Sequence, residues 1–108
     1  MNNVKVPTNN NYRDYLIKSL RDPEEAAAYL EAILEEQNPE PELLKAALLD
    51  VAEALGNTHI SPDQSQFHHN KLDEILSQTG SNAVYSLSEW LNDLGLKLTV
   101  TVADQEQE

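Results

Sequence analysis

The stretch FHHNKLDEILSQTG, residues 67–80, contains side chains that could contact a nucleic acid. Lysine neutralises phosphates, and Asn or Gln can pair with base edges in the major groove. Histidine gains charge below its usual pKa of about 6.5. Two acids, Asp73 and Glu74, share the stretch and would oppose phosphates. The candidate DNA-contacting residues are His68, His69, Asn70, Lys71 and Gln78.

The same stretch offers a spacing that metal sites use. His69 and Asp73 lie four residues apart, which places both on one face of a helix. The only further ligands in reach are the distant His59 and Asp63, and surface histidines without a metal are far commoner. The chain also lacks a Gly-rich phosphate loop and a Ser/His/Asp set. We therefore predict no metal, no cofactor and no enzymatic activity.

Acidic residues dominate the middle of the chain. Of the formal net charge of -12, residues 22–53 carry ten acids against Lys45 alone. This charge either serves solubility alone or attracts a basic partner. Tyr12 and Tyr15 either pack the first helix on the second or form an aromatic contact surface. The candidate partner-binding residues are Tyr12, Tyr15, Glu24, Glu25, Glu31, Glu35 and Glu36.

Length and composition predict a single cytoplasmic domain. The 108 residues suffice for one helical core. There is no cysteine, no apolar run of about 18 residues and no apolar signal-peptide core at the start. We divide the chain into a flexible arm at 1–11, one domain at 12–102 and an acidic disordered tail at 103–108.

Capping residues and proline positions predict three helices in the first half. Asp22 is an N-cap followed by Pro23 at the first helical position, and Asn38 is the expected cap of the next helix. Gly56 is the expected stop. The expected helices span residues 12–21, 23–36 and 40–55.

The second half predicts three further helices and a strand. A short helix is expected from Ser61, a fifth at 67–77 and a sixth that starts at the Ser86 capping box and stops at Gly95. LKLTVTV at 96–102 alternates with period two, which predicts a strand. Its partner is either VKV at 4–6 or the same strand of a second copy. The candidate dimerisation residues of this homodimer are Leu96, Leu98 and Val100.

Three segments of this frame carry a resemblance to a known family: YRDYLIKSLRDPEEAAAYLEAILEE, LLKAALLDVAEALG and ILSQTGSNAVYSLSEWLNDLGLKLTV. Over residues 12–102 the chain resembles the HigA-like antitoxins of prophage-type addiction modules. The resemblance implies a mainly α, lambda-repressor-like helix-turn-helix domain that binds its own operator DNA as a dimer. It also implies a basic, mRNA-cleaving partner toxin of the RelE/HigB type.

The chain departs from this family where the family binds DNA. The family's turn glycine, Ser or Thr cap and arginine are replaced here by Gln66, His68 and His69. Asp73 and Glu74 replace a Tyr and a basic residue. We therefore expect an antitoxin-like protein that binds a basic toxin, with transcriptional autoregulation weakened or lost. The alternative is an acidic protein-interaction module, or a nucleic-acid mimic, on the same scaffold.

Overall fold

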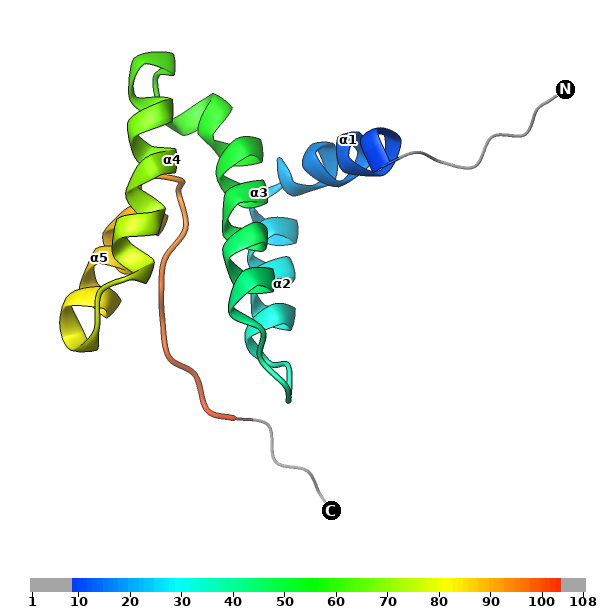
Figure 1. Ribbon diagram of the computed structural model, residues 1–108. Helices are drawn as coiled ribbons and strands as arrows, with labels where there is room; N and C mark the ends of the chain where they lie inside the picture. The colour runs from blue at the N-terminus through cyan, green and yellow to red at the C-terminus, as the bar shows by residue number, and fades with distance from the viewer. Residues whose placement is uncertain (1–8, 104–108) are drawn as a thin grey trace, which may run out of the picture.

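Five helices form the fold of the computed structural model, which describes residues 9–103 and the side chains of residues 11–103 (Figure 1). They are α1 (Asn9–Leu20), α2 (Pro23–Leu34), α3 (Pro41–His59), α4 (Pro62–Leu76) and α5 (Gly80–Asn92). The helix α1 packs against α2 and α3, and α2 also packs against α3. The helices α4 and α5 form a second group, which contacts the first through α3. The mainly helical fold predicted from the sequence is confirmed.

The start of α2 follows the predicted capping rule. The carboxylate of Asp22 accepts a hydrogen bond from the Glu24 N–H at 3.0 Å, and Pro23 occupies the first turn. The start of α3 does not: Glu40 is its N-cap residue and makes no side-chain capping bond. The prediction of Asn38 as the cap is therefore wrong, because Pro41 in the first turn fixes a later start.

The third helix does not stop at Gly56. It continues to His59, and Gly56 accepts a hydrogen bond from the Ile60 N–H at 2.9 Å. A glycine inside a helix costs only about 1 kcal/mol, which this bonding and the buried side chains around it offset. The stop comes from Pro62, because a proline disfavours helical backbone at the residue before it, and Ser61 is extended with ψ 154°.

The two helices predicted on either side of Gln66 are one helix, α4. The turn expected at Gln66 is absent, and the Gln66 side chain instead donates a hydrogen bond to Asn70 one turn later, at 3.0 Å. No proline or glycine interrupts residues 63–76. The buried side chains of His68, Leu72 and Ile75 form a single stripe at helical spacing. Six predicted helices therefore become five.

The last helix begins earlier than the sequence predicts. It starts at Gly80, so Ser86 lies in the middle of α5 and does not cap it. The predicted end is closer, because α5 ends at Asn92 and Gly95 has a left-handed φ of 86°. The Leu96 N–H then returns to the Leu91 carbonyl at 2.9 Å. This glycine-based ending sets the direction in which the chain leaves α5.

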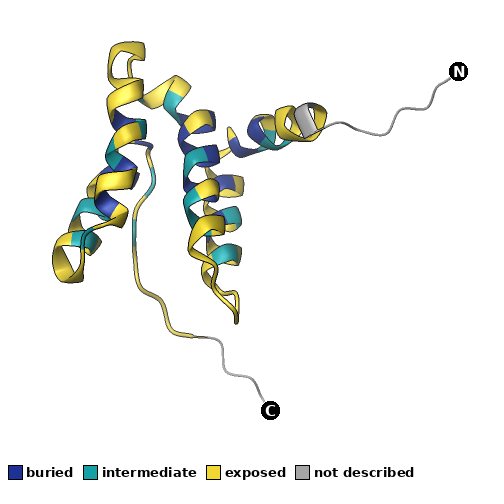
Figure 2. Ribbon diagram, viewed as in Figure 1, coloured by how far each residue is buried: buried dark blue, intermediate teal, exposed yellow. Residues whose placement is uncertain are grey.

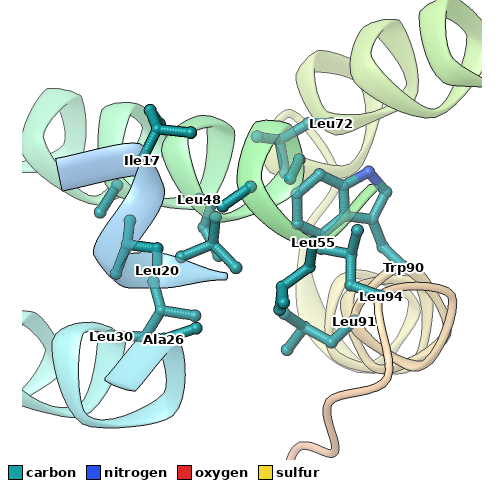
Figure 3. Packing of buried hydrophobic residues seen from close by; sticks show 14 of the residues in the cluster. Ile17, Leu20, Ala26, Leu30, Leu48, Leu55, Leu72, Trp90, Leu91 and Leu94 are labelled. Carbon is teal, nitrogen blue, oxygen red and sulfur yellow. The ribbon is translucent and has the colours of Figure 1, made fainter. Parts of the chain in front are cut away.

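The core follows α3, which contributes buried side chains to both helix groups (Figures 2 and 3). On one side Leu48 lies near Ile17 and Leu20 of α1. On the other side Leu55 lies near Trp90 and Leu94. Trp90 is 2% exposed, which confirms its predicted place in the core. One continuous cluster of buried apolar residues therefore joins all five helices.

No strand is present among residues 9–103. Residues 96–103 run as an irregular, outstretched segment beside the helices (Figure 1). Leu96 and Leu98 are partly buried against the core, whereas Val100 and Val102 are 94% and 85% exposed. The predicted pairing with residues 4–6 lies outside the described residues.

Candidate functional site

The first candidate surface is the exposed side of α4, where the DNA-contacting residues were predicted. His68 does not lie on that side, because it is 6% exposed and stacks on Trp90. The two ring centroids are 4.4 Å apart and the planes differ by 10°. The Trp90 indole N–H donates to the His68 carbonyl at 2.7 Å, and His68 Nε2 lies 3.0 Å from the Trp90 carbonyl. His68 thus holds α4 on α5.

The other predicted DNA contacts are also partly engaged inside the fold. Lys71 lies 3.7 Å from Glu74, and its ammonium sits 6.0 Å from the centre of the Phe67 ring. His69 and Gln78 are half-buried, and Gln78 Oε1 is buried without a hydrogen-bond partner among the described atoms. Of the five, only Asn70 is exposed, and its side-chain oxygen accepts the hydrogen bond from Gln66. The five residues therefore do not form a shared surface of donors.

The charge on α4 also opposes contact with phosphates. Asp63, Asp73 and Glu74 are exposed on this helix, against Lys71 as its sole formal cation. Asp73 forms an ion pair at 2.6 Å with Lys45 of α3. The hydrogen bond to Asp73 and the attraction of its charge raise the pKa of Lys45. Lys45, the one lysine or arginine among residues 22–53, thus pairs with an acid of α4 and not with the acids of α2.

The second candidate surface is the acidic face of α2 together with the two glutamates that follow its end. Glu24, Glu25, Glu31, Glu35 and Glu36 are all exposed. Within residues 11–103, the ion pairs involve other acids, namely Asp50, Glu53, Asp73 and Glu74. The five carboxylates therefore face solvent without a cation of the described chain within salt-bridge distance. This surface can attract a cation from another molecule.

An aromatic surface lies on α1, the helix that packs against α2. Tyr12 and Tyr15 of α1 are 63% and 72% exposed, so they do not pack α1 onto α2. The Tyr12 phenol lies close enough to influence Tyr29 of α2. Burial, Asp50 and then Tyr12 raise the pKa of Tyr29. Of the two interpretations left open by the sequence, the exposures favour an aromatic contact surface.

The sequence did not predict the polar link that holds α1 on α3. Arg13 of α1 donates to Asp50 of α3 at 2.6 Å and also pairs with Glu53. Tyr29 of α2 is 3.5 Å from the second oxygen of Asp50. The hydrogen bonds that Arg13 donates to Asp50 and Glu53 raise the pKa of Arg13. A signal was available, because Arg13 precedes Ile17 by four residues and Leu20 by seven, which places it on the side of the helix that carries these apolar residues.

A pocket of about 450 Å³ lies where α4 and α5 meet the end of α3. Phe67 and Lys71 line it from α4, Glu89 and Trp90 from α5, and His59 from α3. Its walls carry charges of both signs. In the described part of the chain, no group of three or more His, Asp or Glu side chains could hold a metal ion. His69 and Asp73 therefore remain a pair without a third ligand.

Comparisons with known proteins assign no function to these surfaces. No family model, curated protein or solved structure matches the chain. None of the described helices is both long and apolar enough to cross a membrane.

Proposed function

We propose that the chain is an antitoxin-like protein-binding module that docks a basic partner on α1 and α2. The resemblance to HigA-like antitoxins suggests that the partner is a basic toxin of the RelE/HigB type. The observation that carries the proposal is the unpaired acidic surface of α2 and the two residues after it, whose five glutamates are exposed, on a helix that packs against α1 with its exposed Tyr12 and Tyr15. The net charge of -12 would speed encounter with a cationic protein.

Recognition on this surface would divide between two kinds of side chain. The glutamates of α2 would steer the partner and set its orientation, and this contribution is screened by salt. Tyr12 and Tyr15 would supply the desolvated contacts that dominate binding energy at interfaces. The antidote would act by covering the cationic surface with which the toxin grips RNA.

In the same proposal, operator binding is weakened or lost. The resemblance would put the family's DNA-reading helix at residues 67–77, which here belong largely to the single helix α4, without the turn expected before them. His68 is committed to Trp90, and the exposed charges of α4 are mainly acidic. Phosphate contacts supply much of the affinity of proteins for DNA, and α4 has little to offer them.

Charge reversal on α2 tests the partner surface. The variant E24K/E31K/E35K should bind the purified basic product of the neighbouring reading frame at least about tenfold more weakly. Its three new lysines would repel the positive charges of that partner. The matched control is D63K/E89K/D93K, which changes the net charge equally at exposed positions of α4, α5 and the end of α5. Calorimetric titration should show a much smaller loss for the control.

Two outcomes would contradict the proposal. Equal losses in both variants would show attraction to the whole charged molecule and no docking surface on α2. Undiminished binding by E24K/E31K/E35K would place the partner elsewhere.

A mobility-shift assay on the DNA upstream of the chain's own reading frame tests whether operator binding is weakened or lost. We expect no specific retardation at physiological salt, at pH 6 or at pH 7.5. Specific retardation would mean that His69, Asn70 and Lys71 suffice, and that the protein is an autoregulator. Binding to a basic nucleic-acid-binding protein in competition with RNA, without a toxin, would instead favour the nucleic-acid mimic.

A further inference from the structure

The segment after α5 has an alternating pattern of exposure that stops halfway along. Lys97 and Thr99 are exposed, while Leu96 and Leu98 are partly buried against the core. The same alternation should turn Val100 and Val102 inward, yet they are 94% and 85% exposed (Figure 2). The helices of one chain therefore cover only the first half of an apolar face that the sequence continues to residue 102.

Among the described residues, the backbone of residues 97–103 makes no hydrogen bond to other backbone groups. The last backbone–backbone hydrogen bond of the described chain is donated by the Leu96 N–H to Leu91. For residues 97–103 the structure gives no such bond. Four of these residues are Thr or Val, which favour strands. An outstretched segment with open N–H and C=O groups is a template for strand addition.

We propose that residues 96–102 pair with the same residues of a second copy as a two-stranded antiparallel ribbon with Thr99 on the two-fold axis. In this register Leu98 lies opposite the Val100 of the second copy, and Leu96 lies opposite its Val102. Residues directly opposite in an antiparallel pair point to the same side of the ribbon. Each exposed valine is thereby placed beside a leucine that already packs on the other copy's core.

The register also fits the charges. Lys97 is the only charged residue between positions 94 and 103, and it lies opposite Thr101. The ribbon therefore brings no two like charges directly opposite each other, which would be destabilising. Each strand also carries its lysine toward a chain of net charge -12. The contact is self-complementary and has two-fold symmetry, so the pairing of these residues closes at two copies. It does not depend on the basic partner proposed above.

Single cysteines test the register in a chain that has none of its own. Residues opposite each other have Cα atoms about 4.5–5.5 Å apart, within the range that a disulfide can bridge. Under a mild oxidant, Thr99→Cys should become mostly covalent dimer, whereas Lys97→Cys and Thr101→Cys should each stay monomeric on non-reducing gels. An equimolar mixture of Lys97→Cys and Thr101→Cys should cross-link.

The state of the unmodified protein gives a second readout. Light scattering behind size exclusion should show a dimer that dissociates on dilution. Val100→Asp should give monomer at every concentration without loss of helical circular dichroism, since Val100 is exposed in the single chain. Thr101→Asp is the matched control, because it adds the same charge opposite Lys97 and should remain dimeric.

The proposal is overturned by a monomer at all concentrations, by cross-linking at position 97 alone as fast as at 99, or by Thr99→Cys that stays monomeric. Cross-linking of Thr99→Cys to the basic partner, with no self-dimer, would also overturn it and would show strand addition by that partner.

Discussion

Each of the two helix groups contains a polar link between its own helices, and the two links differ in character. At the α4–α5 contact, His68 and Trp90 are both nearly fully buried. Their rings stack, and a ring nitrogen of each residue lies within hydrogen-bond distance of the backbone carbonyl of the other. At the α1–α3 contact, Arg13 reaches Asp50 and Glu53 with its side chain 47% exposed. A buried, satisfied polar pair strengthens a contact, whereas an ion pair open to water contributes little. The difference predicts where the fold tolerates change.

The largest effect should come from the buried side of this comparison. Trp90→Ala removes a large ring from the core and leaves the His68 carbonyl without its donor. We expect a loss of about 3–5 kcal/mol in the free energy of unfolding, measured by urea denaturation. Val84→Ala on the same helix, at a side chain 54% exposed, is the control. A loss below that of Val84→Ala would contradict the assignment of this contact as the stronger link.

The α1–α3 contact should be more tolerant. Asp50→Ala takes the acceptor from Arg13 and Tyr29, at a side chain that is 13% exposed. We expect a loss of about 1.5–3 kcal/mol in the free energy of unfolding, the range for hydrogen bonds to a charged group. Glu53→Ala removes the more exposed partner of the same arginine and should cost less than about 1 kcal/mol. Equal losses of stability for Asp50→Ala and Glu53→Ala in denaturant melts would show that burial does not determine how much each acid contributes.

The capping residue between α1 and α2 should rank next. Asp22→Ala removes the acceptor of the Glu24 N–H, and about 1 kcal/mol of stability should be lost. Asp14→Ala, an exposed acid within α1, is the matched control for charge. If thermal melts showed that Asp14→Ala loses as much stability as Asp22→Ala or more, the capping role of Asp22 would be ruled out.

The smallest effect should come from Lys45 and Asp73, which join α3 to α4 at the surface. Both side chains are substantially exposed. Lys45→Met should leave the denaturation midpoint unchanged within error, and 1 M salt should not distinguish it from the parent. A clear loss would mean that this pair, rather than buried apolar contacts, joins the two groups.

The sequence predicted local features well where a single short-range cause decides them. Asp22 and Pro23 start α2 as expected, and Trp90 lies in the core. Predictions failed where tertiary contacts outweighed local signals. The helix α3 continues past Gly56 because its neighbouring side chains are buried. The break expected at Gln66 is absent because His68 is buried together with Leu72 and Ile75 along one side of α4.

For the candidate surfaces, composition was more informative than spacing. The exposure of the α2 glutamates followed from their helical positions. The loss of His68 to the interior could not be foreseen, since its partner Trp90 is 22 residues away. The pairing of Arg13 with Asp50 spans 37 residues and is equally invisible to local pattern, although a charge on an apolar stripe marks where to look.

The position of α3 has a consequence for the turnover of the protein. Its 19 residues supply buried side chains to both helix groups, so neither group keeps a complete core when this helix is pulled away. A protease that unravels its substrates from one end would therefore meet one barrier rather than two. Once that barrier is crossed, the whole chain is released to degradation in a single event, with no stable half left behind.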